Sequence, residues 1–413
     1  MADTPDEKAH WQAVIRAFDG YMQYHLSANH ARRMAFLSLP KESREMFEGI
    51  GYREKLDSVD EGIRRNAEFI DEMIADPVFA EMLAEDDSES AHAHAHSHSH
   101  SHSHSHAHPK SPSTKPSQHE SDLAQDKVRS TLRSFVRDWA VDGEQERMQC
   151  YDPCLEALEK HFPVIEGGRE RGDVRVLVPG CGLGRLAMEI AARGFASQGN
   201  EFSTYMLLAS HYVLNQTTRR HSHSIYPHLH SFSNHRSTID DLLRRVQIPD
   251  VCPSDVLGNG RGGEFSLVAG DFEEIYGEGH WGTGNAGGGE HEGGEVDQLG
   301  RYGAVVTCFF IDTARNVLNY LKIIYNILQD DGVWINIGPL LWHFENSPTT
   351  SSKGEGSIEL SLDEVKELAR RVGFTISNEK TIPTTYTGIQ DGMLKHEYQA
   401  AFWTATKTKS TSK

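Results

Sequence analysis

Three glycines in a short loop are the first residues of this sequence that could bind a ligand. Gly180, Gly182 and Gly184 follow a β-branched run that ends at Pro179, and a helical pattern begins directly after them. Glycine lets the backbone turn sharply and approach a ligand where any Cβ would collide. The dinucleotide-binding pattern spaces its glycines as G-x-G-x-x-G, which brings a pyrophosphate to the helix N-terminus. Here the third glycine comes one residue earlier, and this tighter turn suits a nucleoside ligand without phosphates.

Acidic side chains end the next two predicted strands. Glu201 lies seventeen residues after Gly184, where a carboxylate can accept hydrogen bonds from both hydroxyls of a ribose. Asp271 and Phe272 follow the third strand, and we expect Asp271 to accept from the exocyclic amine of an adenine and Phe272 to pack on its ring. Ligands of open parallel sheets bind at the carboxyl ends of the strands. These residues predict a nucleoside pocket, and the tight glycine turn favours S-adenosylmethionine, as in methyltransferases.

A second group of candidates comes from the later strands. Asp312 ends an otherwise apolar run over residues 304–311, where a charge is costly unless it is paired or functional, so this residue is either catalytic or a cap for the next helix. Cys308 in the same run is expected to line the cofactor pocket. His343 follows the fifth strand in a loop that faces the same cleft, unless it is an ordinary surface histidine. Tyr398, near the last strand, could close the pocket with its hydroxyl or could pack in the core.

Two polar residues precede the sheet in a helical stretch. Gln145 and Arg147 could cover the bound cofactor, with Arg147 on its carboxylate, because a planar guanidinium matches a carboxylate bidentately. The alternative is that both lie on a solvated helix face. The five cysteines are odd in number and scattered, so we expect reduced thiols and no metal site.

The elements that position these residues alternate between strands and helices. Short β-rich runs and helical patterns follow one another from residue 174 to 406, which predicts an α/β fold with a parallel, doubly wound sheet. We therefore expect the Rossmann-like fold of class I methyltransferases, with a mostly parallel seven-stranded sheet that ends in an antiparallel strand. The expected strands cover residues 174–178, 196–201, 265–271, 304–311, 333–338, 374–380 and 398–406.

The sequence divides into three parts. Residues 1–84 carry apolar side chains at helical spacing and are expected to form an N-terminal helical unit. Residues 85–127 begin with a run rich in Ser, His, Pro and Lys and are expected to be a disordered linker, because such a segment cannot bury a core. Residues 128–413 form the expected methyltransferase domain, interrupted by loop insertions at about 219–262 and 277–300.

A histidine occupies every second position from His92 to His108. Neutral imidazoles at this close spacing can share a zinc or nickel ion, so the non-enzymatic alternative for this chain is a metal-binding protein. The other interpretation is a solvated spacer.

The overall charge limits the classes of partner. With 60 acidic against 41 basic residues the formal charge is −19, and such a field repels phosphate backbones. We expect no nucleic-acid partner and a small or cationic substrate, and a homodimer is compatible with the sequence. No run of about 18 apolar residues occurs, and the N-terminus lacks the basic start and apolar run of a signal peptide. These features predict no membrane partner and a cytoplasmic location that could extend to the nucleus.

Nine short stretches, spread from about Val128 to Thr406, carry a common family pattern: Arg129–Leu132, Phe135–Trp139, Glu146–Arg147, Leu177–Gly180, Gln198–Glu201, Gly270–Phe272, Cys308–Ala314, Asn336–Phe344 and Ser357–Ser361. Together they resemble the carnosine N-methyltransferase family. The resemblance implies transfer of a methyl group from S-adenosylmethionine to an imidazole nitrogen of carnosine, or of a related histidine-containing peptide, giving anserine from carnosine and S-adenosylhomocysteine. A protein histidine or another small molecule is the alternative acceptor.

Two features depart from the family's pattern. The tyrosine-rich run that the family has near its C-terminus is Lys395-His396-Glu397-Tyr398 in this chain, which affects how a substrate fits. The insertions at 86–121 and 277–300 are particular to this sequence.

Methyl transfer to an imidazole mainly requires alignment of donor and nucleophile, because a neutral imidazole already has a free lone pair. The ring also needs a partner that accepts the N–H of the opposite nitrogen, since this fixes the tautomer and stabilises the charge that grows during transfer. The resemblance implies this role for Asp312, with His343 and Tyr398 as further catalytic residues.

Overall fold

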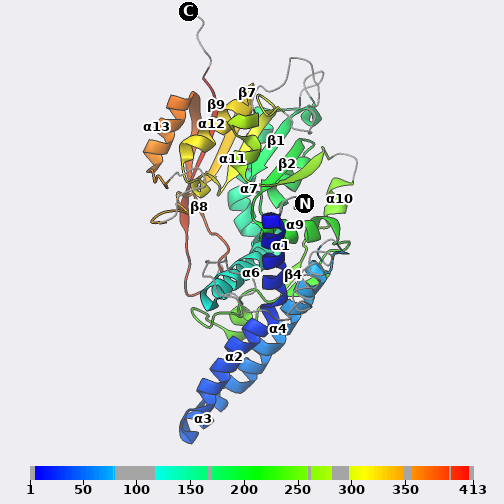
Figure 1. The fold of residues 1–413 in the computed structure, drawn as a ribbon, viewed down its shortest axis with the longest axis vertical. Helices are drawn as coiled ribbons and strands as arrows, with labels where there is room; N and C mark the ends of the chain where they lie inside the picture. Colours follow the sequence, from blue (N-terminus) through cyan, green and yellow to red (C-terminus); the bar gives the residue numbers. More distant parts are fainter. Residues whose placement is uncertain are drawn as a thin grey trace, which may run out of the picture. The chain divides into compact units, whose positions relative to one another are not determined.

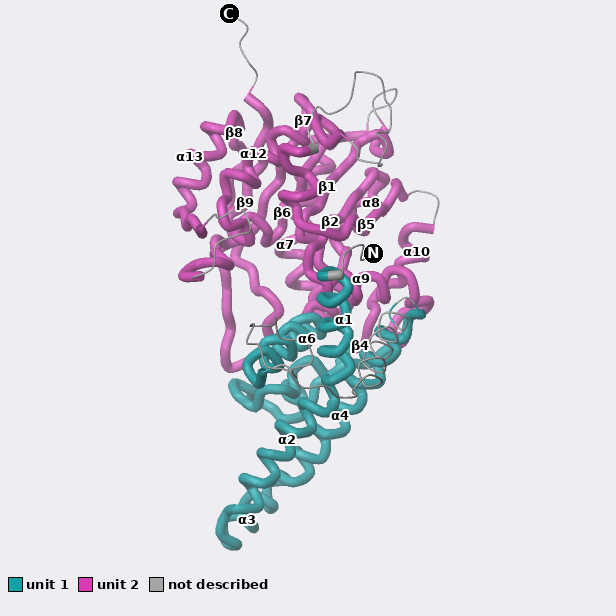
Figure 2. The backbone as a smooth tube through the Cα atoms, viewed as in Figure 1, with its two compact units in different colours: residues 1–133, 223–246 teal, residues 134–222, 247–413 magenta. Residues whose placement is uncertain are grey.

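The structure of this chain is a computed structural model. It describes residues 5–77, 79, 117–164, 170–258, 262–280, 297–347, 356–389 and 392–408. The histidine tract at 92–108 and most of the insertion at 277–300 therefore lie outside the described residues. The chain divides into two compact units, which are coloured separately in Figure 2. We call residues 1–133 with 223–246 the helical unit, and residues 134–222 with 247–413 the sheet unit.

The sheet unit is built on seven strands in the order β5-β2-β1-β6-β7-β9-β8 (Figure 1). All neighbouring strands are parallel except that β9 runs antiparallel to both β7 and β8. This topology confirms the predicted doubly wound, mostly parallel sheet with a late antiparallel strand. The strands are β1 (Arg175–Pro179), β2 (Ala196–Glu201), β5 (Phe265–Ala269), β6 (Tyr302–Cys308), β7 (Leu328–Gly338), β8 (Phe374–Thr384) and β9 (Tyr398–Lys407).

The strand order reverses at β1. Successive strands β2 and β5 extend the sheet to one side of β1, whereas β6 and β7 extend it to the other. Val176 of β1 pairs with Ser197 of β2 and with Ala304 of β6, so β1 lies between these two strands. In doubly wound sheets ligands bind in the crevice outside the carboxyl ends of the strands at such a reversal point. The fold therefore places the expected binding region just after Pro179 and Cys308.

Helices cover both faces of this sheet, because alternate residues of each strand point to opposite sides. Val176 and Val178 pack with residues of α7 (Glu144–His161) and α8 (Arg185–Ala192). Leu177 packs on the other face, in a core that includes residues of α11 (Phe272–Tyr276), α12 (Val317–Ile327) and α13 (Leu362–Val372). The remaining helical elements of the unit are η1 (Val141–Gly143), η2 (Arg171–Asp173), α9 (Thr204–Asn215), α10 (Pro253–Leu257), η4 (Glu278–His280) and η5 (Ile311–Thr313).

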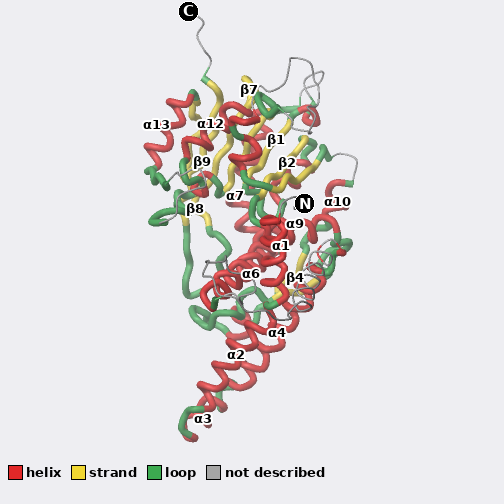
Figure 3. Tube along the Cα trace, in the orientation of Figure 1, coloured by secondary structure: helices red, strands yellow, loops and turns green. Residues whose placement is uncertain are grey.

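The helical unit contains α1 (Pro5–Asp19), α2 (Tyr21–Leu37), α3 (Lys41–Glu48), α4 (Tyr52–Ile74) and the first part of α6 (Gln118–Trp139), drawn red in Figure 3. It also includes residues 223–246, which contain η3 (Thr238–Leu242). The short strands β3 (His223–Ile225) and β4 (Val246–Ile248) pair at the two ends of that segment. No helix in the described ranges is long and apolar enough to cross a membrane.

Residues 223–246 were expected to belong to an insertion of the methyltransferase domain, and the structure places them with the N-terminal helices instead. The side chain of Asn66 in α4 explains this placement. Its Nδ2 donates to Tyr21 Oη at 2.8 Å and to the Tyr226 carbonyl at 2.9 Å, while its Oδ1 accepts from Tyr226 N at 2.7 Å. A buried amide that bonds both backbone groups of Tyr226 fixes the segment on α4, and no local sequence signal reports such a contact.

Candidate active site

A cavity of about 530 Å³ lies in the sheet unit at the carboxyl ends of the parallel strands. Its lining includes Gly180 after β1, Glu201 at the end of β2, Asp271 after β5 and Cys308 at the end of β6. These are four of the predicted cofactor-binding residues, brought from separate strands to one space. The volume is in the usual range for a small-molecule site.

The glycine turn adopts a backbone that other residues rarely tolerate. Gly180, Gly182 and Gly184 have φ values of 63°, 57° and 81°. A Cβ on Gly180 would lie 2.6 Å from a ring carbon of Phe310, so only glycine fits between the turn and this aromatic side chain. Gly180 and Gly182 line the cavity, whereas Gly184 is the N-cap of α8 and does not.

The Glu201 carboxylate holds the glycine turn and also faces the cavity. Its Oε2 accepts from Gly182 N at 2.8 Å, and its Oε1 accepts from Phe202 N and Ser203 N at 2.9 and 2.8 Å. Burial raises the pKa of Glu201, and the three backbone N–H groups act in the opposite direction. A carboxylate offers about four acceptor positions, so these three bonds leave about one for a hydroxyl of a ribose.

The residues after β5 carry the two groups expected beside an adenine, a hydrogen-bond acceptor and an aromatic ring. Asp271 caps α11, with Oδ1 accepting from Glu273 N at 2.8 Å and Glu274 N at 3.1 Å. Phe272 is buried against Phe310, edge to face at 5.2 Å between centroids. Asp271 and Phe272 both line the cavity. An acceptor beside an aromatic surface fits a purine with an exocyclic amine.

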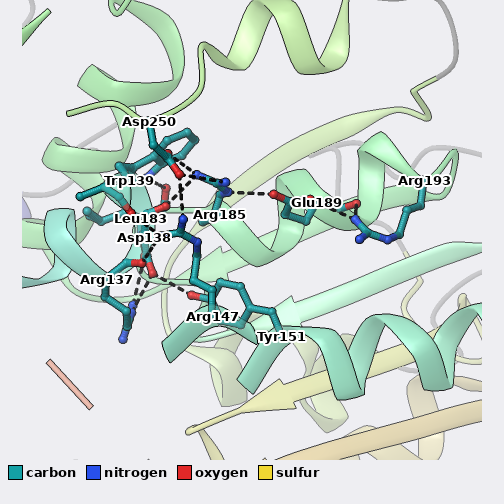
Figure 4. A network of polar contacts seen from close by, with 11 residues as sticks. Arg137, Asp138, Trp139, Arg147, Tyr151, Leu183, Arg185, Glu189, Arg193 and Asp250 are labelled. Carbon is teal, nitrogen blue, oxygen red and sulfur yellow. Dashed lines mark hydrogen bonds and ion pairs between the residues drawn. The ribbon is translucent and has the colours of Figure 1, made fainter. Parts of the chain in front are cut away.

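A buried aspartate that was not predicted as a site residue ties α6 to the glycine turn. Asp138 receives two bonds from Arg137, Nε to Oδ1 at 2.7 Å and Nη2 to Oδ2 at 3.0 Å. Tyr151 Oη donates to Oδ1 at 2.7 Å, and Leu183 N in the turn donates to Oδ2 at 3.3 Å (Figure 4). Burial alone would raise the pKa of Asp138, but the Arg137 guanidinium, the Tyr151 hydroxyl and Arg147 together outweigh burial and lower that pKa.

Arg147 lines the cavity, and its guanidinium takes part in a second cluster of this network. Figure 4 shows Arg147 and Arg185 converging on Asp250, with contacts of 2.7 Å from Arg147 Nη2 to Oδ2 and 2.7 Å from Arg185 Nη1 to Oδ1. Arg147 Nη1 donates to the carbonyls of Arg137 and Ala140 at 2.7 and 2.8 Å. The Arg147 guanidinium therefore links α7 to the end of α6 and to the segment after it, and the residue also lines the cavity.

The two residues predicted ahead of the sheet differ in their position: Arg147 lines the cavity and Gln145 does not. Gln145 is exposed on α7 and does not line the cavity. Arg137 lines it and is the better candidate for the carboxylate of a cofactor, because its Nη2 lies 3.0 Å from the position of a Cβ on Gly182. The Phe135–Trp139 stretch was part of the family resemblance, but nothing in its spacing indicated that Arg137 and Asp138 would meet the glycine turn.

Aromatic side chains form the wall of the cavity beyond the end of β6. Phe309 stacks on Tyr386, with centroids 4.8 Å apart and planes at 22°. Both residues line the cavity, and Tyr386 Oη accepts from Arg137 Nη1. Tyr398 lies in β9 behind this wall, edge to face with Phe309 at 5.9 Å, and is not part of the lining. The tyrosine that lines the cavity is thus Tyr386, whereas the predicted Tyr398 packs on Phe309 outside the lining.

Asp312 and His343 are neighbours, but only His343 lines the cavity. Asp312 is buried, its Oδ2 accepts from Leu341 N at 2.9 Å, and its carbonyl accepts from His343 N at 3.1 Å. Asn316, not Asp312, caps α12 by accepting from Leu318 N at 3.1 Å. The helix-cap alternative for Asp312 is therefore wrong, and its carboxylate instead fixes the loop that presents His343.

Glu146 is a further lining residue that sequence reasoning missed. Its two carboxylate oxygens accept from Thr387 N at 3.2 and 3.0 Å, which fastens the segment that carries Tyr386 to α7. Burial raises the pKa of Glu146 to about 7, while Arg137 and the Thr387 N–H act in the opposite direction. The only sequence signal was its place beside Arg147 in the family pattern.

The family pattern for carnosine N-methyltransferase matches residues 114–409 of this chain. The chain belongs to the carnosine N-methyltransferase family. It is 41% identical over 288 residues to the carnosine N-methyltransferase of Schizosaccharomyces pombe, covering 69% of this chain and 71% of that protein. It is 41% identical over 286 residues to that of Mus musculus, covering 68% of this chain and 63% of that protein. The sheet unit is therefore an S-adenosylmethionine-dependent methyltransferase domain, and its cavity residues fit the donor.

Solved structures of similar chains are more distant. Magnesium protoporphyrin IX methyltransferase from Synechocystis, with bound S-adenosylhomocysteine, is 12% identical with a TM-score of 0.37 and covers 70% of this chain and 97% of its own. The 1,6-didemethyltoxoflavin-N1-methyltransferase of Burkholderia thailandensis is 15% identical with a TM-score of 0.34 and covers 73% of this chain and 94% of its own. The assignment of the fold rests on the strand order given above rather than on these likenesses.

Proposed function

We propose that this carnosine N-methyltransferase family member transfers the methyl group of S-adenosylmethionine to an imidazole nitrogen of carnosine, giving anserine and S-adenosylhomocysteine. The observation that carries the proposal is a single cavity lined by residues that follow β1, β2, β5, β6 and β7. We assign Gly180, Glu201 and Asp271 to a donor half, and Phe309 and His343, which follow β6 and β7, to an acceptor half. Donor and acceptor can therefore meet at the end of β6.

In the donor half, each group has a separate part. Bound S-adenosylmethionine supplies an electrophilic methyl on its sulfonium. The lining residues that would hold it are Glu201, which would accept from a ribose hydroxyl, Asp271, which would accept from the adenine amine, and Arg137, which would bind the carboxylate. Gly180 lets the backbone approach the ligand without a Cβ. Because Asp138 and the glycine turn are already bonded to each other, these groups are held in place before the donor binds.

In the acceptor half, the chain has to orient an imidazole and stabilise the charge that develops on it. The stacked pair of Phe309 and Tyr386 supplies an aromatic surface for the ring. His343 is the lining residue that can bond the imidazole nitrogen opposite the attacked one. Asp312 acts through the loop, because its carboxylate fixes Leu341 and its charge lies close to His343.

An assay with a panel of acceptors tests the proposal. Purified protein is incubated with methyl-labelled S-adenosylmethionine and, separately, with carnosine, other histidine-containing peptides or an unfolded protein extract, and the products are analysed by mass spectrometry. We expect methylated carnosine as the main product. Labelling of protein histidines without turnover of free carnosine would replace carnosine with a protein acceptor.

We also propose that the protein acts in the cytoplasm or nucleus, with a small peptide rather than a nucleic acid as its partner. The five cysteines are free thiols, which fits a reducing compartment, and the net charge of −19 opposes binding of a phosphate backbone. Cell fractionation tests the location, and a nucleic-acid shift assay tests the absence of nucleic-acid binding.

A homodimer stays a prediction. Light scattering of the purified chain measures its molar mass in solution and so its oligomeric state.

A further inference from the structure

A second, smaller cavity lies at the other end of the same strands. Its volume is about 150 Å³, and it is lined from the amino-terminal parts of four adjacent strands, β5, β2, β1 and β6. We call it the amino-end cavity, and its polar lining consists mainly of Arg175, Gln198, Glu264, Ser266, Arg301 and Tyr302. In the described part of the chain it shares no lining residue with the active-site cavity. A polar space of this size can hold several water molecules or a small polar ligand.

The side chain of Gln198 organises the hydrogen bonds in this lining. Its Oε1 accepts from Tyr302 Oη at 2.6 Å and from Tyr276 Oη at 3.1 Å, and its Nε2 donates to Ser266 Oγ at 3.3 Å. The amide oxygen is therefore occupied by two hydroxyl donors. Ser266 Oγ has accepted a bond, so its own O–H can donate to a ligand. A lining that uses its acceptors internally and keeps a donor free favours an anionic ligand.

Arg175 lies on the same side of the sheet as these groups. It is two positions before Leu177, Leu177 pairs with Gln198, and Gln198 pairs with Ser266. Side chains alternate along a strand, so Arg175, Gln198 and Ser266 point to one face. Burial raises the pKa of Tyr302, and the charges of Arg301 and Arg175 act in the opposite direction. Both guanidinium groups therefore lie close enough to the Tyr302 hydroxyl to influence its charge.

The two arginines lack a counter-charge in the described structure. Neither the Arg175 nor the Arg301 side chain forms a hydrogen bond or ion pair with any described residue, and Glu264 in the same lining forms no ion pair there either. Other arginines of the sheet unit have a carboxylate oxygen within 3.0 Å, namely Arg137, Arg147, Arg171, Arg185 and Arg193. Carboxylates are abundant in this chain, with 60 acidic against 41 basic residues. Two guanidinium groups against one carboxylate leave the amino-end cavity with an excess of positive charge, which attracts an anion.

We propose that the amino-end cavity binds a tetrahedral oxyanion, phosphate or sulfate, between Arg175 and Arg301, with the Ser266 hydroxyl as a further donor. Guanidinium groups bind such oxygens through paired N–H groups. The bound anion would join the first residues of β1 to the start of β6. Because it binds only the folded chain, it also stabilises the sheet unit by mass action. The site takes no part in methyl transfer, and this inference does not depend on the proposed function.

The test is calorimetric titration of the full chain with inorganic phosphate at constant ionic strength. We expect a Kd on the order of 1 mM or lower, and we expect sulfate to compete with phosphate. Arg301→Gln should weaken binding at least about tenfold, because charge-assisted hydrogen bonds are lost. Arg175 is exposed, so Arg175→Gln should weaken it less, by at least about threefold. Glu264→Gln removes a like charge and should tighten binding about two- to fivefold.

The matched control is Arg219→Gln, which removes an exposed arginine outside the amino-end cavity and should leave the Kd unchanged. Phosphate should also raise the midpoint of thermal unfolding of the wild type and of Arg219→Gln, relative to sodium chloride of equal ionic strength, and raise it less in Arg301→Gln. The opposite effects of Arg301→Gln and Glu264→Gln distinguish a binding site from damage to the fold. Equal Kd values for the wild type and the Arg175→Gln, Arg301→Gln double variant would overturn the inference, and so would a phosphate signal that chloride reproduces.

Discussion

Asp138 and Leu183 are 45 positions apart in the chain, yet the Asp138 carboxylate accepts a hydrogen bond from the backbone N–H of Leu183. This contact joins the end of α6 to the glycine turn, and the same carboxylate holds the guanidinium of Arg137. A residue outside the cavity lining therefore holds the groups of the donor half in place.

We expect Asp138→Asn to lower the free energy of unfolding by roughly 3 kcal/mol, because the buried Arg137 then loses its counter-charge. The affinity for S-adenosylmethionine should fall as well. The pKa of Asp138 is lower in the folded chain than in the unfolded chain. The ionised carboxylate therefore stabilises the fold at a pH above the ordinary pKa of aspartate, and this stabilisation is lost as the pH falls through the pKa of the folded chain. Urea unfolding of both proteins at pH 7 and at about pH 3 measures this; a difference that does not shrink at low pH would contradict it.

We expect Glu201→Ala to weaken S-adenosylmethionine binding by about 2 kcal/mol, through loss of charge-assisted bonds to the ribose. Glu201→Gln is the matched variant, since its carbonyl oxygen can still accept from Gly182 N or from Phe202 N. It should bind more tightly than the alanine variant and less tightly than the wild type. Calorimetric titration measures all three affinities, and equal values would remove Glu201 from the cofactor site.

Stability should depend on the protonation of Glu146. Its pKa rises from an ordinary 4.5 to about 7, so the folded chain keeps this proton up to a higher pH than the unfolded chain. The stabilisation of the fold by the protonated Glu146 is complete at a pH below the ordinary pKa of 4.5 and is lost as the pH rises through about 7. Its upper limit is about 3 kcal/mol, and the partial exposure of the side chain reduces it.

The measurement is the free energy of unfolding of wild type and Glu146→Gln between pH 5 and pH 8. We expect the wild type to lose stability relative to the variant across this range. Glu367→Gln changes an exposed glutamate of α13 and serves as the control, with no relative change. Parallel pH profiles for wild type and Glu146→Gln would mean that Glu146 is ionised throughout.

Deleting residues 91–108 should leave kcat and KM for carnosine within roughly twofold, because a polar low-complexity segment makes few contacts that folding or catalysis needs. Steady-state kinetics of the deletion protein test this, and a collapse of activity would show that the histidine tract belongs to the working fold. Zinc and nickel titrations of both proteins measure separately whether the tract binds metal.

Asp312→Asn should reduce kcat on the order of 100-fold while S-adenosylmethionine affinity stays near wild type. The amide oxygen can still accept from Leu341 N, so the loop is kept and only the charge near His343 is lost. Asn316→Ala is a useful comparison, because it removes the cap of α12 and should affect stability more than turnover. Near-wild-type kcat in Asp312→Asn would end the assignment of any electrostatic role to Asp312.

Much of the fold and of the donor half could be predicted from the sequence, because the signals there are local. The glycine spacing, the acidic residue at the end of β2 and the pair Asp271-Phe272 each lie within a few residues of a strand end, and all but Gly184 reach the cavity. The parallel order of the strands follows from the alternation of strands and helices.

The rest depends on contacts between distant parts of the chain. Arg147 is adjacent to the cavity, but its guanidinium is bonded to Asp250, 103 positions away. Tyr386 reaches the cavity because Arg137 and Glu146 hold its segment, across more than 200 positions of sequence. Such side chains carry no local signal, and the packing that selects them is visible only in the folded chain.

The measurement that most directly tests this account is an NMR spectrum of the product formed from carnosine and ¹³C-methyl S-adenosylmethionine. We expect a single labelled N-methyl resonance with long-range couplings to the imidazole ring protons, and we expect its formation to be abolished when the donor is omitted. A labelled methyl on the β-alanyl amine, or no transfer to carnosine by folded protein that binds the donor, would contradict the claim that this cavity places an imidazole nitrogen in line with the methyl group.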